Sequence, residues 1–265
     1  MLKFATNLTF MFTEKPFLER FSLARAAGFR RVEFHHPYPF CERLDDIRYA
    51  AREAGVEILH CNLPGGDWDS GERGIAVWPE RRNEFADGVT TTLEIARVLG
   101  IHQLNCPLGY PRDDQAADEA QRTLIDNLRY AADTCAAQGV RLLVEPLNPI
   151  THPGYPLVTT RDGVALLGAV NHPNLKLQYD IYQMQRSEGE LIETLRRHRE
   201  HIGFVQLADN PGRGEPGTGE IHYPFLFREL EKMAFDKVIS LEYTPSTTTQ
   251  QSLGWLKDYG LSLDA

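Results

Sequence analysis

The chain alternates short apolar runs with stretches of helical character, and this alternation limits the folds open to it more than any other feature. Four of the helical stretches end at a glycine directly before the next apolar run, at Gly28, Gly55, Gly100 and Gly139, as helices commonly do. The pattern predicts eight βα units. The strand-like runs are residues 3–9, 31–36, 57–63, 102–108, 141–147, 175–180, 202–209 and 238–244.

Eight such units in 265 residues predict a (β/α)8 TIM barrel, because each parallel strand needs a crossover helix before the next strand. The alternative is an open, doubly wound sheet. That fold usually carries a GxGxxG motif after its first strand, whereas NLTFMFTEK at residues 7–15 contains no glycine. No Ser/Gly linker or change of composition divides the chain. We therefore expect a single TIM-barrel domain over residues 1–265.

Composition excludes several classes of protein. The hydrophobic content of 42% is enough for a large core. MLKFATNLTF lacks the apolar segment of a signal peptide, and no apolar run approaches the roughly 20 residues of a membrane helix. We therefore expect a cytoplasmic protein with no membrane partner. The net charge of −9 argues against a nucleic-acid partner. A homo-oligomer is among the states left open.

The four cysteines are scattered along the chain and form no CxxC pair. They are Cys41, Cys61, Cys106 and Cys135. This spacing argues against zinc-ribbon or thioredoxin-like chemistry and agrees with a reducing compartment. We expect them to be ordinary packing residues.

Polar side chains end four consecutive strand-like runs. Glu145 lies in VEPLNP, Asp180 in QYDIY, Gln206 in FVQLADN and Glu242 in SLEYTP. Each alone is more typical of a cap or a solvated surface residue. The carboxyl ends of barrel strands meet at one rim, where three carboxylates would raise one another's pKa unless a cation neutralised them. Oxygen ligands suit Mg2+ or Mn2+ better than zinc, so the set predicts one divalent metal.

Several longer segments resemble one family. They are VEPLN, QYDIYQMQ, FVQLADNPGRGEPGTGEIHY, SLEYTP and NLPGGDWDSGERGIA at 62–76. Together they closely resemble the hydroxypyruvate isomerases within the xylose isomerase-like TIM barrels, whose relatives include 2-oxo-tetronate isomerases and, more distantly, ketose 3-epimerases. The resemblance runs essentially end to end. It implies that Glu145, Asp180, Gln206 and Glu242 are the metal ligands, and that Glu145 and Glu242 are also the acid and base.

The reaction implied by the resemblance interconverts hydroxypyruvate and 2-hydroxy-3-oxopropanoate. A proton moves between adjacent carbons through an enediolate, with glutamates removing and returning it and a metal stabilising the oxyanion. Which glutamate acts first is not fixed. A hydride shift would need two metal sites, and only one full ligand set is present.

An anionic substrate of an acidic protein needs a local cation. Arg213, in NPGRGEPG, is the first choice because the surrounding glycines let backbone amides approach an anion. Arg73, in the 62–76 segment, is the second choice and a candidate lid residue. Relatives commonly carry histidine three residues after the aspartate ligand, where this chain has Gln183, which can hydrogen-bond to a substrate oxygen but cannot titrate. Further candidate substrate contacts near the rim are Asn7, His36, His60 and Asn62.

Other functions remain as alternatives. On the same site, the chain could be a 2-oxo-tetronate isomerase or a ketose 3-epimerase. An endonuclease of the AP-endonuclease type would require several metals and a basic surface. A non-catalytic sugar-acid binder would keep its ligand affinity after Glu145→Gln, whereas an isomerase would lose turnover.

Overall fold

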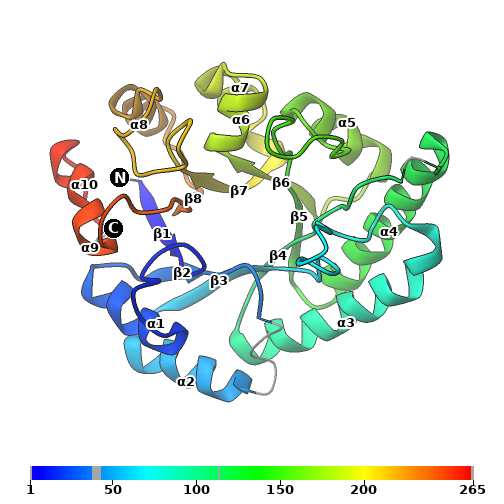
Figure 1. The fold of residues 1–265 in the computed structure, drawn as a ribbon, viewed down its shortest axis with the longest axis horizontal. Helices are drawn as coiled ribbons and strands as arrows, with labels where there is room; N and C mark the ends of the chain where they lie inside the picture. The colour runs from blue at the N-terminus through cyan, green and yellow to red at the C-terminus, as the bar shows by residue number, and fades with distance from the viewer. Residues whose placement is uncertain (1, 38–42, 113, 264–265) are drawn as a thin grey trace.

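The eight strands close into one parallel barrel surrounded by helices, as seen down the barrel in Figure 1. This is a computed structural model that describes residues 2–37, 43–112 and 114–263. Strands β1 to β8 follow one another around the barrel in chain order, and β8 pairs with β1, with Lys3 opposite Val238. The TIM-barrel prediction is therefore confirmed.

All eight predicted strand runs contain a strand. The strands are β1 Lys3–Asn7, β2 Arg31–Glu33, β3 Glu57–Asn62, β4 Gln103–Asn105, β5 Arg141–Val144, β6 Leu175–Asp180, β7 Ile202–Leu207 and β8 Val238–Leu241. The described α-helices are α1 Phe17–Ala26, α2 Leu44–Ala54, α3 Arg82–Leu99, α4 Ala117–Ala137, α5 Thr160–Val170, α6 Ile181–Ser187, α7 Leu191–Arg197, α8 Tyr223–Lys232, α9 Thr249–Ser252 and α10 Gly254–Asp258. Short 3-10 turns are η2 Pro79–Arg81 and η3 Arg199–His201.

The glycines that follow the helices have the backbone conformation that their position requires. Gly55 and Gly100 end α2 and α3 with φ of +67° and +73°. A side chain is disfavoured in this left-handed region, so glycine ends these helices at little cost. The chain then turns back into the barrel, which fixes where β3 and β4 begin.

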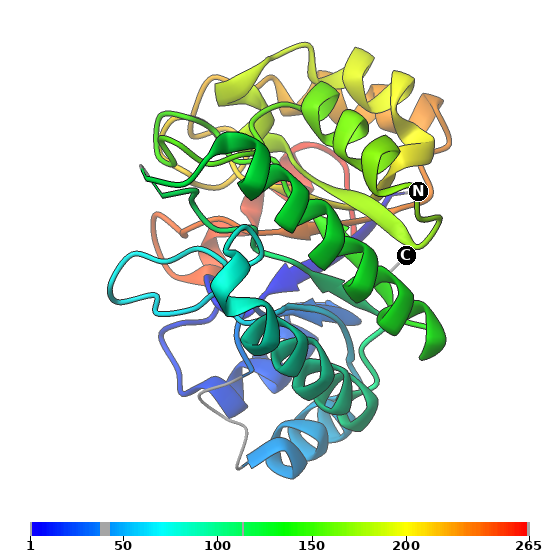
Figure 2. The ribbon, with the colours of Figure 1, turned by 90° about the vertical axis from the view of Figure 1, so that its right-hand side faces the viewer.

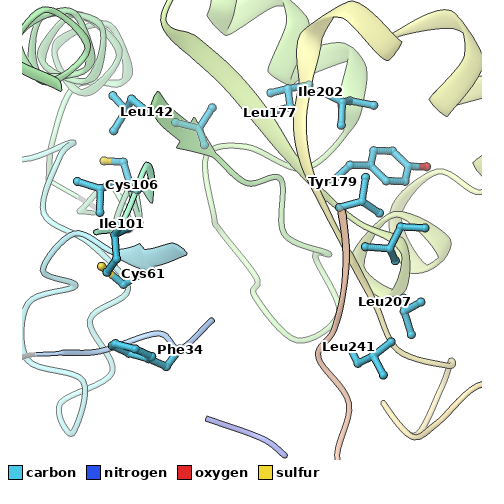
Figure 3. Close-up of a cluster of buried hydrophobic side chains, with 14 of the residues drawn as sticks. Phe34, Cys61, Ile101, Cys106, Leu142, Leu177, Tyr179, Ile202, Leu207 and Leu241 are labelled. Atoms are coloured by element: carbon cyan, nitrogen blue, oxygen red, sulfur yellow. The ribbon is translucent and has the colours of Figure 1, made fainter. Parts of the chain in front are cut away.

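The hydrophobic core has two parts. A large layer lies between the strands and the helices, and Figure 3 shows Cys61, Ile101 and Cys106 gathered there on one side of the barrel. A small cluster of Ala5, Leu59, Leu143 and Phe204 forms the other part. Burying a leucine or phenylalanine side chain contributes about 1.5–3 kcal/mol. The small cluster consists of residues on β1, β3, β5 and β7, so it fills the barrel interior below the polar rim.

Two β-bulges reverse the side-chain alternation in β3 and β7. Between β2 and β3 the pairing passes from Val32–Ile58 to Glu33–His60, leaving Leu59 unpaired. Between β6 and β7 it passes from Leu177–Ile202 to Gln178–Phe204, leaving Gly203 unpaired. A one-residue shift moves every later side chain to the other face of a strand. The bulges therefore direct His60 and Gln206 into the barrel.

The three cysteines that the structure describes, Cys61, Cys106 and Cys135, are free and buried, as expected of packing residues. Cys41 lies outside the described residues. Within the described part of the chain, no helix has both the length and the apolar character needed to cross a membrane.

Candidate active site

A small cavity opens at the carboxyl ends of the strands. Figure 2 shows the loops that follow the strands, including the cyan segment after β3, at the opposite end of the barrel from the chain termini. The cavity has a volume of about 240 Å³. Its lining combines acidic, basic and amide side chains with aromatic and aliphatic ones. It consists of Phe10, His35, Asn62, Trp68, Arg73, Asn105, Pro107, Glu145, Leu147, His152, Tyr155, Gln183, Arg213 and Glu242.

Asp180 ends β6 and also caps the next helix. Its Oδ1 accepts a hydrogen bond of 2.9 Å from the backbone N–H of Tyr182 in α6. Its Oδ2 is buried and has no hydrogen-bond donor, while Nη2 of Arg213 lies 3.6 Å away. The cap therefore uses one carboxylate oxygen and leaves the other facing a cation.

Glu242 follows β8 and is the most heavily bonded carboxylate of the rim. Its Oε1 accepts hydrogen bonds from Asn7 Nδ2 at 3.0 Å and Gln206 Nε2 at 2.9 Å, and lies 2.5 Å from His35 Nε2. Its Oε2 bonds to Arg213. Burial alone would raise the pKa of Glu242, but Arg213 and His35 hold it at about 2. Glu242 is therefore ionised at neutral pH.

Two glutamine side chains connect Glu145 to Glu242. Gln178 Nε2 donates to Glu145 Oε2 at 2.8 Å and to Gln206 Oε1 at 2.7 Å. Gln206 Nε2 in turn donates to Glu242. Gln178 lies two residues before Asp180, so both side chains lie on the same face of β6. The chain of amides holds the two glutamates in a fixed relation beside the cavity.

Arg213 brings a positive charge into this acidic rim. Its guanidinium lies 5.1 Å from the ring centroids of both Phe10 and Tyr182, an arrangement that favours a cation. The loop that carries it is anchored at Asp209, whose carboxylate accepts backbone N–H bonds from Asn210, Gly217, Gly219 and Ile221. The anchored loop places the guanidinium beside Asp180 and Glu242.

Arg213 does not fully neutralise the other two acids of the rim, Asp180 and Glu145. Burial raises the pKa of Asp180 to about 7, against the opposing effect of Arg213. Burial, together with Glu242 and Asp180, raises the pKa of Glu145 well above its usual value. Ionising both groups in this site is therefore costly unless further positive charge enters it.

A divalent cation fits the chemistry of this group, because the donors are oxygens and Asp180 Oδ2 has no hydrogen-bond donor. In the described part of the chain, no three His, Cys, Asp or Glu side chains already surround a common metal position. Arg213, in contact with both Asp180 and Glu242, is instead the cation present among these carboxylates.

The segment after β3 covers one side of the cavity. Arg73 lies 4.2 Å from the ring centroid of Trp68 and donates hydrogen bonds to the backbone oxygens of Trp68 and Glu72. Gly74 packs so closely on Pro107 that a Cβ at this position would lie 2.1 Å from the Pro107 oxygen. The segment is thus a tightly seated lid that places Trp68 and Arg73 on the cavity wall.

The structure brings the predicted residues into three groups. Glu145, Asp180, Gln206, Glu242 and Arg213 lie together at the rim, with Asn7 bonded to Glu242. Asn62, Arg73 and Gln183 line the cavity. The others lie elsewhere: His60 is fully buried against Glu33, and His36 contacts Trp68 with ring centroids 4.5 Å apart.

Sequence reasoning left several site residues out. Gln178 carried a signal, because it lies two residues before Asp180 on the same strand face. His35 is the neighbour of the predicted contact His36, and its own partner, Glu242, comes from the last strand run. His152 and Tyr155 come from the loop after β5 and carried no recognisable signal. Burial, together with the positive charges of Arg213 and Arg73, lowers the pKa of His152 to about 4, so this wall of the cavity is neutral.

Comparison with known proteins identifies similar chains. Residues 21–259 match the family described as xylose isomerase-like TIM barrel. The hydroxypyruvate isomerase of Escherichia coli is 43% identical over 98% of this chain and 100% of its own length. The 2-oxo-tetronate isomerase of Cupriavidus necator is 39% identical over 98% of this chain and 99% of its own length. A crystal structure described as an AP endonuclease of family 2, from Brucella melitensis, is 39% identical with a TM-score of 0.93, covering 98% of this chain and 99% of that chain.

Proposed function

The chain belongs to the xylose isomerase-like TIM barrels, in the group of hydroxypyruvate isomerases and 2-oxo-tetronate isomerases, and from this premise we propose that it isomerises a small oxo-acid. The substrate pair that we propose is hydroxypyruvate and 2-hydroxy-3-oxopropanoate. The observation that carries the proposal is the placement of Glu145 and Glu242 on one small cavity that also contains Arg213.

The size and charge of the cavity support a short, anionic substrate. Its volume of about 240 Å³ is below the roughly 300–1,000 Å³ typical of pockets for larger ligands. Arg73 and Arg213 both line it, and arginine is well suited to bind a carboxylate. These features favour a three-carbon oxo-acid over a ketohexose, which is longer and carries no charge. A 2-oxo-tetronate is one carbon longer and remains the second candidate.

The chemistry that we propose is a proton transfer between neighbouring carbons. One glutamate takes a proton from C3 of hydroxypyruvate, which gives an enediolate, and the other glutamate delivers a proton to C2, while the proton on the C3 oxygen is lost and the C2 oxygen gains one. The amide chain through Gln178 and Gln206 holds the two carboxylates in place before the substrate arrives, which lowers the cost of alignment. The lid residue Trp68 limits the access of water.

We further propose that one divalent cation, Mg2+ or Mn2+, binds among Glu145, Asp180, Gln206 and Glu242. The Oδ2 of Asp180, which has no hydrogen-bond donor, and the raised pKa values of Asp180 and Glu145 support a cation there. When bound, it stabilises the negative charge that develops on the substrate oxygens. With a cation in that place, Arg213 would no longer be needed as the counterion of these carboxylates and could bind the substrate carboxylate.

An endonuclease function is less well supported. The Brucella relative carries that description, but this chain has a net charge of −9, whereas DNA binding rests largely on cationic contacts to phosphates. The cavity, with a volume of about 240 Å³, is also too small to hold a DNA duplex. Failure of the protein to cleave DNA with abasic sites in the presence of Mg2+ would agree with this assignment.

The experiment that tests the proposal is an assay of the chelator-treated protein with and without added Mg2+ or Mn2+. The substrates are hydroxypyruvate, 2-oxo-tetronates and ketohexoses. We expect metal-dependent formation of 2-hydroxy-3-oxopropanoate, with the highest kcat/KM for hydroxypyruvate. Full activity in chelator would refute the cation, and a higher kcat/KM for a 2-oxo-tetronate would refute the substrate while keeping the reaction. Glu145→Gln distinguishes an isomerase, which loses turnover, from a binder, which keeps ligand affinity and has no turnover to lose.

A further inference from the structure

Glu33 is a buried carboxyl group that the proposed reaction does not use. It ends β2 and its side chain is fully buried in the barrel. Buried carboxyl groups are rarely found without hydrogen-bond partners or a counter-charge. Its Oε1 accepts a hydrogen bond of 3.0 Å from Gln206 Nε2. Its Oε2 lies 2.8 Å from Nδ1 of His60. Glu33 therefore contacts one residue of the candidate site directly and one residue below it.

His60 packs against Glu33 inside the barrel, although Glu33 Oε2 and the two His60 ring nitrogens form no hydrogen bond. Its side chain is fully buried, and its ring stacks on Phe204 with centroids 5.1 Å apart and an angle of 12° between the planes. The bulges at Leu59 and Gly203 direct His60, Phe204 and Gln206 to the barrel interior. The chain thus builds a layer of Phe204, His60 and Glu33 directly beneath Gln206.

Glu33 and Glu242 together select one orientation of the Gln206 amide, because Gln206 Nε2 donates to both. A carboxylate oxygen only accepts, so the end of the amide that faces it is the donor, Nε2. The opposite end, Oε1, then lies toward Gln178, which donates to it at 2.7 Å and donates to Glu145 at 2.8 Å. A glutamine in a site of this kind is useful only with its oxygen toward the cation, because a reversed amide would present N–H groups to a positive charge.

We propose that Glu33 is a positioning residue that fixes the Gln206 amide with its oxygen available to a divalent cation. This inference rests on the proposed function, because it takes Gln206 as a ligand of that cation. Changes in such supporting residues typically weaken metal binding by about 10- to 100-fold. We expect Glu33→Gln, which keeps the size of the side chain but can donate or accept, to weaken Mn2+ binding by about this factor.

A double-mutant cycle separates the effect of Glu33 on the orientation of the Gln206 amide from the effect of its negative charge. Glu33→Gln also removes a negative charge near the site, and that effect lowers Mn2+ affinity whatever residue 206 is. Gln206→Glu replaces the amide by a carboxylate, whose two oxygens are equivalent, so either orientation presents an oxygen to the cation. We therefore expect Glu33→Gln to weaken Mn2+ binding by about 10- to 100-fold beside Gln206 and by much less in the Gln206→Glu background. The proposal would be overturned if Glu33→Gln weakened Mn2+ binding by the same factor in both backgrounds, or if it did not weaken Mn2+ binding when residue 206 is glutamine.

Calorimetric titration of Mn2+ into the full-length, chelator-treated protein measures these affinities. Glu188→Gln is the matched control, because Glu188 is also a carboxylate accepting hydrogen bonds, from Thr160 at the start of α5, and it does not line the cavity. We expect this control to bind Mn2+ as the unchanged protein does. A comparable loss of affinity in the control would show that any missing carboxylate weakens the site, and would also overturn the proposal.

Thermal unfolding without metal tests the same contact independently of the cation. Gln206→Glu places two carboxyl groups against each other at positions 33 and 206, so we expect a lower Tm. Combining it with Glu33→Gln restores one donor and one acceptor at this contact. The exchanged pair should therefore regain part of the lost Tm, while the contact between position 206 and Glu242 stays repulsive. If the unchanged protein bound no Mn2+, the proposed cation would fail, and this cycle would still decide the role of Glu33. A Tm of the exchanged pair no higher than that of Gln206→Glu would refute it.

Discussion

Asn148 holds the oxygen of Gln183 with two hydrogen bonds. The backbone N–H of Asn148 donates to Oε1 of Gln183 at 3.0 Å, and its Nδ2 donates to the same oxygen at 2.5 Å. Gln183 is buried and borders the cavity. Because its oxygen is engaged by Asn148, its amide nitrogen is the end available to a substrate. Gln183, three residues after Asp180, is thus oriented as a hydrogen-bond donor.

Gln183→Glu tests this orientation. A carboxylate still accepts both bonds from Asn148, so the fold is kept, but its second oxygen repels an anionic substrate. Loss of a hydrogen bond to a charged group costs about 1.5–3 kcal/mol, so we expect KM for hydroxypyruvate to rise about tenfold or more. The control is Gln185→Glu on the same helix, which lies outside the cavity lining. An unchanged KM for Gln183→Glu would show that Gln183 does not contact the substrate.

Arg213→Met removes the positive charge from the rim. Methionine retains apolar contact between Phe10 and Tyr182, so the loop should keep its place. Because the substrate carboxylate loses its cationic partner, we expect KM to rise by about 10- to 100-fold. Arg112→Met is the control: Arg112 also lies over an aromatic ring, that of Trp78, but pairs with Glu80 outside the cavity. Equal KM values for the two variants would contradict an anchoring role for Arg213.

Gly74→Ala tests the seating of the lid. The added Cβ would lie 2.1 Å from the Pro107 oxygen, whereas at Gly71 nothing lies within 4 Å, although φ is positive at both, +118° and +93°. Both alanine variants carry backbone strain, but only Gly74→Ala must displace the lid. We expect kcat/KM to fall about 10- to 100-fold in Gly74→Ala and to stay unchanged in Gly71→Ala. Equal losses would assign the effect to backbone strain rather than to the lid.

The stabilising effect of the cation should depend on pH. The pKa of Asp180 rises from 3.8 to about 7 in the folded protein, and that of Glu145 also rises. The folded state therefore holds protons that the unfolded state has lost, so metal-free stability decreases as pH rises through this range. A cation binds the ionised carboxylates and offsets this loss. We expect Mn2+ to increase Tm more at about pH 8 than at about pH 5.5; an equal increase at both would contradict it.

Much of the fold could be predicted from local patterns in the sequence. The apolar runs mark the eight strands, and glycines such as Gly55 and Gly100 mark helix ends because the left-handed conformation excludes most other residues. The composition of the rim could be predicted as well. Because the strands of a parallel barrel all end on one side, Glu145, Asp180 and Glu242 could be expected to lie close together.

What the sequence did not reveal depends on contacts between distant segments. The bulges at Leu59 and Gly203 reverse the alternation in β3 and β7, so the position of His60 below the cavity could not be read from a period of two. The repulsion among the rim acids predicts a divalent cation, which stays a prediction. The pairing of Arg213 with Asp180 and Glu242 depends on how the loop anchored at Asp209 folds. The roles of the individual site residues stay predictions.

The central claim is proton transfer between the adjacent carbons of a small oxo-acid, and deuterium incorporation tests it most directly. The Mn2+-loaded protein is incubated briefly with hydroxypyruvate in deuterated water, and the product is analysed by NMR spectroscopy. Because the glutamate that returns the proton exchanges with solvent, we expect one deuteron at C2 of 2-hydroxy-3-oxopropanoate. Product carrying only protium at C2 would instead indicate direct hydrogen transfer between the carbons and would contradict the proposed roles of Glu145 and Glu242.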